Sequence, residues 1–134
     1  MAPVFPTITA LLAALLGLLA ALLTVQVIRN RVRFGVDVSD GGNAPLAQAI
    51  RAHANLAEQA PIGLILLALA EAAGTQRWLI ASLGGLFLIA RLASAWALSH
   101  TLRQSPPRQA GAGLTVLVSV AAALLVLYRL TLAN

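Results

Sequence analysis

The stretch ITALLAALLGLLAALLTVQVI, residues 8–28, contains no charged side chain. An α-helix needs about 20 residues to cross the hydrocarbon core of a bilayer, so this stretch predicts a transmembrane helix. A cleaved signal peptide is the alternative interpretation. However, no Arg or Lys precedes Arg29, and the apolar run is longer than the roughly 7–15 residues of the hydrophobic region of a signal peptide. We therefore expect a retained first helix over about residues 7–29.

The composition of the chain supports the same class. Of its 134 residues, 60% are hydrophobic and only 10% are charged. This is too little charge to cover a water-soluble domain, and the chain is too apolar to be disordered. The net charge of +5 comes from nine Arg and no Lys, which on an apolar chain favours a lipid bilayer over nucleic acid as partner. Because there is no Cys, any thiol chemistry must use a thiol supplied by a ligand, and we expect no metal site.

Polar segments divide the rest of the chain into three more helices. Residues 29–45 (RNRVRFGVDVSDGGNAP) are expected to form a loop, Gly74-Thr75 a tight turn, and residues 103–108 a connection that contains two prolines. The predicted fold is all-α, an up-down bundle of four transmembrane helices in a single membrane domain over 1–134. The expected helices span about residues 7–29, 46–73, 77–102 and 107–131.

The arginines are distributed unequally between the two ends of this bundle. By the positive-inside rule, the arginine-rich connections face the cytoplasm and both termini lie outside. The five arginines expected on the cytoplasmic side are Arg29, Arg31, Arg33, Arg103 and Arg108, against Arg77 and Arg129 on the other side.

Charged residues also occur inside the predicted spans. Glu58 and Arg91 are equally far from the Gly74-Thr75 turn, about 25 Å each at the helical rise. A lone charge at that depth costs about 3 kcal/mol or more, so such residues are usually paired. We therefore predict a Glu58–Arg91 ion pair, either as a structural clamp or as a device that also fixes Glu58 for a ligand. Glu71, near the turn, is expected to be solvated or paired with Arg77.

A polar stripe on the second helix points to a ligand. Arg51, Asn55 and Glu58 follow each other at i, i+4 and i+7, within about 60° on one helix face. A guanidinium, an amide and a carboxylate together suit a small zwitterion such as a peptide or amino acid. His53 points about 160° away from this face, where a packing role is the simpler interpretation.

The same stretch, RAHANLAEQAP (51–61), resembles the RxxxNxxExxP signature of the MAPEG superfamily, the membrane-associated proteins in eicosanoid and glutathione metabolism. The similarity extends to QVIRNR (26–31), SDGGN (39–43) and the ARL of residues 90–92, and is strongest to the small bacterial branch. This resemblance implies a bacterial inner-membrane homotrimer that binds glutathione between neighbouring subunits on the cytoplasmic side. It implies that the glutathione contacts are Arg31, Arg51, His53, Asn55 and Glu58.

The chain departs from the eukaryotic members of that family in two places. Their helix 3 tyrosines align with Ser94 and Leu98, and the arginine that stabilises the thiolate aligns near Ser105. Arg103 or Arg108 could replace this arginine, in both cases only with a shift in register. Arg103 is the first candidate for a catalytic cation and His100 the second. A cationic side chain there would lower the thiol pKa of glutathione, the co-substrate.

Three functions remain open at this point. The first is a glutathione transferase or peroxidase that acts on small lipophilic substrates. The second is a non-catalytic binding or structural membrane protein that keeps the scaffold, which the missing tyrosines favour. A small multidrug exporter fits the length, but such exporters generally have an acidic residue in their first helix, and residues 8–28 contain none.

Overall fold

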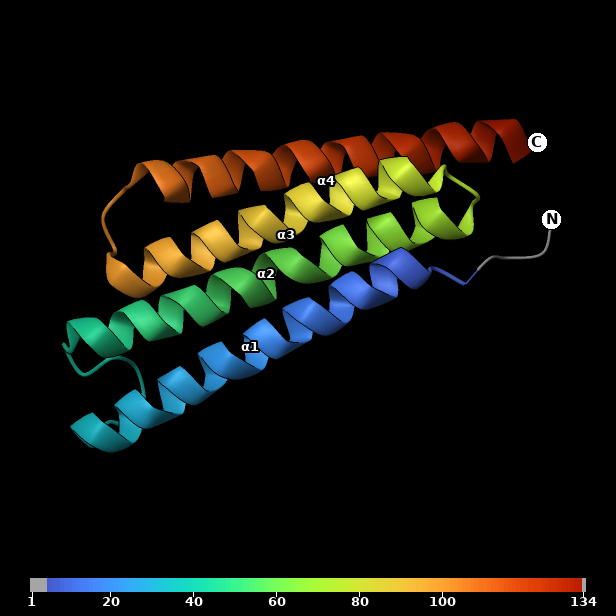
Figure 1. Ribbon diagram of the computed structural model, residues 1–134. Helices are drawn as coiled ribbons and strands as arrows, with labels where there is room; N and C mark the ends of the chain where they lie inside the picture. The colour runs from blue at the N-terminus through green and yellow to red at the C-terminus, as the bar shows by residue number, and fades with distance from the viewer. Residues whose placement is uncertain (1–4, 134) are drawn as a thin grey trace.

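The computed structural model describes residues 5–133 and consists of four long antiparallel helices (Figure 1). The helices are α1 (Thr7–Phe34), α2 (Ala44–Ala72), α3 (Arg77–His100) and α4 (Pro106–Ala133). The α1–α2 and α3–α4 connections lie at one end of the bundle, and the α2–α3 turn lies at the other end together with the start of α1 and the end of α4. The predicted all-α up-down bundle is confirmed. Residues 1–4 and 134 of the predicted domain lie outside the described part of the chain.

Three of the helices, α1, α3 and α4, are long and apolar enough to cross a membrane. The helix α2 is equally long but carries charged residues along its length, Arg51 and Glu58 among them. Large apolar side chains such as Leu18 and Leu124 are exposed on the outer surfaces of α1 and α4. An exposed apolar surface of this extent suits acyl chains rather than water, so the chain is an integral membrane protein.

The first helix is longer than predicted. It continues through Arg29, Arg31 and Arg33 and ends only where Gly35 adopts a left-handed conformation, φ 64°. The amides of Gly35 and Val36 both donate to the carbonyl oxygen of Arg31, which is a common way to terminate a helix. The expectation that a loop begins at Arg29 was wrong, because arginines that cannot lie in lipid can still belong to a helix that extends beyond it.

The core lies between the central helices α2 and α3, with α1 and α4 on either side. Each helix contributes buried apolar side chains, for example Leu16, Leu56, Phe87 and Val118. Two glycines allow close contact between helices. A Cβ atom at Gly63 would collide with the Phe87 ring, and one at Gly111 would lie 2.9 Å from the carbonyl oxygen of Ala90 and still closer to Ser94 Oγ.

The start of α1 is capped by a side chain from α2. Glu71 is only 6% exposed and accepts hydrogen bonds from the amides of Ile8 (2.9 Å) and Thr9 (2.8 Å) and from Thr9 Oγ1 (2.7 Å). The preceding residue Pro6 provides no side-chain cap, and a carboxylate is favourable at the positive end of the helix dipole. The expectation that Glu71 is solvated was wrong, because it is buried and its hydrogen-bond partners belong to α1. Arg77 makes no direct ion pair with it among the described residues and acts only as a nearby positive charge.

Candidate functional site

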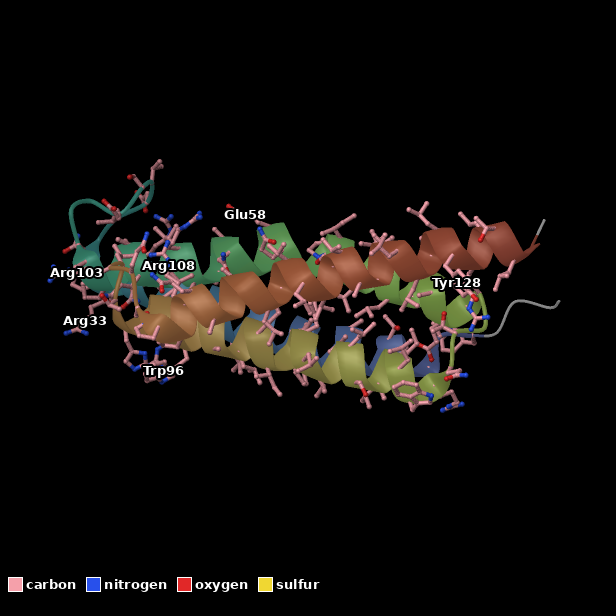
Figure 2. The ribbon with its side chains drawn as sticks, turned by 90° about the horizontal axis from the view of Figure 1, so that it is seen from above. Arg33, Glu58, Trp96, Arg103, Arg108 and Tyr128 are labelled. Carbon is pink, nitrogen blue, oxygen red and sulfur yellow. The ribbon has the colours of Figure 1, made fainter. Side chains whose placement is uncertain are left out.

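The centre of the candidate site is an ion pair along α2. Arg51 Nη1 lies 3.3 Å from Glu58 Oε1, and the two side chains are 47% and 52% exposed. The residues are two turns apart, so the long arginine side chain runs along the helix to reach the carboxylate. Glu58 is at the midpoint of α2, and Figure 2 shows it further from the end of the bundle than Arg33 and Arg103. A charged pair is thus exposed midway along a bundle of apolar helices.

Asn55, the third residue of the stripe, is held from inside the bundle. Arg91 Nη1 donates to Asn55 Oδ1 at 3.2 Å, and Arg91 itself is only 2% exposed. Its Nη2 donates to the carbonyl oxygen of Gly111 (3.3 Å) and to the hydroxyl of Thr115, and lies 3.5 Å from Ser94 Oγ. The guanidinium of Arg91 therefore connects α2, α3 and α4.

The predicted Glu58–Arg91 ion pair does not form between the described residues of this chain. The depth was estimated correctly, because Arg91 does bond to a stripe residue, Asn55, one turn from Glu58. The predicted direction of the Glu58 side chain about the axis of α2 was wrong, because Glu58 points out of the bundle and pairs with Arg51 on its own helix. Arg91 uses neutral oxygen acceptors on three helices in place of a carboxylate.

The acceptors on α4 were missed at the level of sequence. Gly111 offers its carbonyl oxygen to Arg91, and Thr115 offers its hydroxyl while donating to the same Gly111 oxygen at 2.8 Å. Both residues are uncharged and lie in an apolar stretch, so no pattern distinguishes them. The only signal was physical: a buried guanidinium requires several acceptors.

Arg31 stabilises the loop between α1 and α2. Its Nη1 donates to the carbonyl oxygens of Val36 (3.3 Å), Asp37 (2.9 Å) and Ser39 (3.1 Å). Ser39 and Arg51 line the same open hollow of about 300 Å³, and Leu102 of the α3–α4 connection lines it as well. Within this chain, Arg31 therefore shapes the wall beside Arg51 and does not itself join the ion pair.

His53 lies half-buried on α2, two residues after Arg51. Two residues of an α-helix correspond to a rotation of about 200°, so His53 projects from a different face than the Arg51–Glu58 pair. The structure thus places Arg51, Asn55 and Glu58 together and does not bring His53 to them within one chain.

The two candidate catalytic residues lie at the end of α3. His100 Nδ1 is 2.7 Å from the carbonyl oxygen of Trp96, and the two rings are 4.8 Å apart between centroids. Gln48 of α2 donates to the carbonyl oxygen of His100 at 3.1 Å, which joins the start of α2 to the end of α3. Arg103 is exposed in the connection that follows, next to Leu102 of the hollow. Figure 2 shows Arg103 and Arg108 at the same end of the bundle.

The two positions that align with tyrosines in the eukaryotic members are buried inside the bundle. Ser94 is 3% and Leu98 is 1% exposed, and Ser94 Oγ faces the Arg91 guanidinium. Leu98 belongs to the apolar core. Both side chains therefore face the interior of the bundle and not the Arg51–Glu58 pair, and neither has the phenol that a tyrosine would offer at its position.

Comparison with known proteins agrees with this geometry. The model of the MAPEG family matches residues 9–128. The chain is also similar to the inner membrane protein YecN of Escherichia coli K12, with 34% identity over 95 residues, which cover 71% of this chain and 72% of the relative. The YecN of Escherichia coli O6:H1 (strain CFT073) matches to the same extent. The family match includes all four helices and the polar stripe of α2, and the chain therefore belongs to the MAPEG family.

Proposed function

We propose that the protein binds glutathione on the α2 stripe (Arg51, Asn55 and Glu58) and is a membrane glutathione transferase that acts on lipophilic electrophiles. The observation that carries this proposal is the half-exposed Arg51–Glu58 pair midway along an apolar bundle. Contact of such a pair with acyl chains would be costly. A wet crevice covered by another protomer removes that cost, and a homotrimer is the assembly that we propose.

The chemistry of the stripe matches the charges of glutathione, which has two carboxylates and one ammonium group. In the free site, Arg51 and Glu58 neutralise each other. A bound zwitterion exchanges this pair for two new ones, a ligand carboxylate on Arg51 and the ligand ammonium on Glu58, so the charge of the crevice stays balanced. Asn55 contributes its amide nitrogen as a donor, because Arg91 already occupies its Oδ1.

Arg31 and His53 are proposed as further glutathione contacts that act across the subunit interface. Within one chain, Arg31 is engaged with loop carbonyl groups through Nη1, and His53 projects from another face of α2. Two protomers that meet along α2 would bring the second face of one helix to the stripe of the next. In this arrangement the glutathione site would include Arg31 and His53 of a neighbouring protomer, which do not reach the α2 stripe within a single chain.

For catalysis we propose that a cation near the thiol favours the thiolate. Arg103 is the first candidate, because it follows Leu102, which lines the hollow beside Arg51; His100 is the second. The thiol proton passes to solvent, and the thiolate attacks an electrophilic carbon of a substrate that enters from the bilayer. A carbon–sulfur bond forms, the bond from that carbon to the leaving group breaks, and the leaving group departs with the electron pair. In a variant of this proposal, the same thiolate attacks a lipophilic peroxide, the O–O bond breaks to release an alcohol, and a second glutathione converts the resulting sulfenic acid to the disulfide with loss of water.

The proposed location is the bacterial inner membrane, with the arginine-rich end in the cytoplasm. The names of the relatives support the membrane, and the positive-inside rule supports the orientation. Glutathione is a cytoplasmic thiol, so this orientation places the start of α2 and the hollow beside Arg51 on the side from which the ligand arrives.

A second candidate is a glutathione-binding protein without catalysis. It is favoured by the replacement of the tyrosines by Ser94 and Leu98, both buried in this chain. The two candidates differ in whether bound glutathione is ionised.

The experiment is a titration of the detergent-purified protein with glutathione, in which heat of binding and thiolate absorbance in the ultraviolet are followed together. Binding with thiolate formed above the level in free solution at pH 7 supports the transferase. Binding without thiolate supports the second candidate, and the absence of binding rejects both. Arg103→Gln is the informative variant, since it should abolish thiolate formation while glutathione still binds.

A further inference from the structure

A second polar surface lies on α1 and involves none of the residues of the α2 stripe. Six residues of α1 line a hollow of about 450 Å³: Leu22, Val25, Gln26, Arg29, Asn30 and Arg33. Counted from Leu22, these residues stand at i, i+3, i+4, i+7, i+8 and i+11. This spacing places all six on one face of the helix over three turns. We call this face the Arg29–Arg33 surface.

The two guanidinium groups of this surface are available for a ligand. Arg29 and Arg33 are one turn apart and exposed. Within residues 5–133, neither side chain has a hydrogen bond or a carboxylate partner, and Arg33 only lies over the ring of Phe34 at 5.4 Å. Arg31, between them, differs because its Nη1 is engaged with three carbonyl groups. The same helix end thus contains one arginine that binds loop carbonyl groups and two whose N–H groups donate to no acceptor within residues 5–133.

The apolar part of the surface adjoins these charges. Leu22 and Val25 are 68% and 51% exposed and lie one to three turns before the arginines. Two amides lie on the same surface: Gln26 at the boundary between the apolar and the charged part, and Asn30 between the two arginines. No acidic residue lines the hollow, so the surface carries two positive charges above an apolar strip.

We propose that the Arg29–Arg33 surface binds the headgroup of an anionic phospholipid. The phosphodiester oxygens accept hydrogen bonds from the two guanidinium groups, the amides bond to the ester or hydroxyl oxygens, and the acyl chain lies along Leu22 and Val25. Charge complementarity selects this occupant, because an anionic lipid brings a net negative charge to the two arginines, whereas the phosphate of a zwitterionic lipid is already neutralised by its own ammonium group. The position fits as well: α1 passes from its uncharged stretch into its arginine-rich end at this surface, as a helix does at the headgroup layer. Figure 2 shows Arg33 at the same end as Arg103 and Arg108.

The test is a titration of the detergent-purified full-length protein with phosphatidylglycerol and, separately, with phosphatidylcholine, followed by native mass spectrometry. The wild type should bind phosphatidylglycerol more tightly than phosphatidylcholine. Arg29→Gln and Arg33→Gln should each weaken the binding of phosphatidylglycerol by about fivefold and change that of phosphatidylcholine little. Arg77→Gln, an exposed arginine at the opposite end of the bundle, is the matched control and should retain the wild-type preference.

Three results would overturn the proposal. The first is a phosphatidylglycerol preference that survives both substitutions. The second is displacement of the lipid by an equal concentration of inorganic phosphate, which would make the surface a general anion site. The third is loss of the oligomer in Arg29→Gln or Arg33→Gln with lipid binding intact, which would make this face a contact between copies of the chain. Since glutathione binding is measured separately, failure of the lipid proposal leaves the proposed function untouched.

Discussion

Arg91 of α3 donates a hydrogen bond to Asn55 of α2, with 3.2 Å between Nη1 and Oδ1. This bond connects the interior of the bundle with the polar stripe on its surface. It fixes which way the Asn55 amide points, and the same guanidinium reaches Gly111 and Thr115 of α4. The orientation of a surface group on α2 is thus set by side chains buried behind it.

The first prediction concerns the stability that Arg91 provides. Arg91→Ala should lower the free energy of unfolding by about 3 kcal/mol, because it opens a cavity and leaves buried oxygen acceptors without a donor. Arg91→Met keeps most of the volume and removes a buried charge, so it should cost less. Denaturant unfolding of both variants in micelles measures the difference. An unfolding midpoint of Arg91→Ala equal to that of the wild type would contradict the central position of this residue.

The second prediction separates the two roles of Arg91. In Arg91→Met, the Asn55 amide loses the partner that orients it, so glutathione should bind severalfold more weakly even though the bundle remains folded. Calorimetric titration of the folded variant measures this loss. Unchanged affinity would mean that Arg91 is a purely structural residue.

The third prediction concerns the close contact of α3 and α4. Gly111→Ala should destabilise the protein by about 1–3 kcal/mol, because the added methyl group collides with Ser94 and the carbonyl oxygen of Ala90. Gly113→Ala is the matched control on the same helix, since a Cβ atom there meets nothing within 4 Å. Thermal unfolding of the pair in detergent should show a lower midpoint for Gly111→Ala only. Equal midpoints would indicate that the helices separate easily at this position.

The fourth prediction concerns the cap of α1. Glu71→Ala should cost about 1–2 kcal/mol, because the amides of Ile8 and Thr9 lose their acceptor. The loss is local, so hydrogen exchange should become faster in the first turn of α1 and stay unchanged in α4. Exchange that is unaltered in the first turn would show that the cap contributes nothing to the stability of the helix end.

The architecture was predictable because it depends on one-dimensional properties of the chain. The uncharged stretch of residues 8–28 and the Gly74-Thr75 turn set the number and direction of the helices. The helical rise placed Arg91 at the depth of the α2 stripe. These features need only length, hydropathy and spacing, all of which are written in the sequence.

The partners of the charged residues were not predictable in the same way. Depth in a helical hairpin follows from residue number, but rotation about the helix axis depends on how all four helices pack. Glu58 therefore paired with Arg51 on its own helix, and Arg91 with uncharged groups on its neighbours. The role of Glu71 was missed for a similar reason, because two of its three donors are backbone amides at the start of α1, which have no signature in the side chains, and the third is the hydroxyl of Thr9 in an apolar stretch.

The most direct test of glutathione binding on the α2 stripe is equilibrium dialysis of labelled glutathione against the purified wild type, Arg51→Gln and the control Arg77→Gln. Arg51→Gln should weaken binding at least about tenfold, because it removes the charge-assisted hydrogen bonds to a ligand carboxylate. Arg77→Gln, at the other end of the bundle, should bind like the wild type. Equal affinity of Arg51→Gln and wild type, or no binding by any of the three proteins, would contradict a glutathione site on α2.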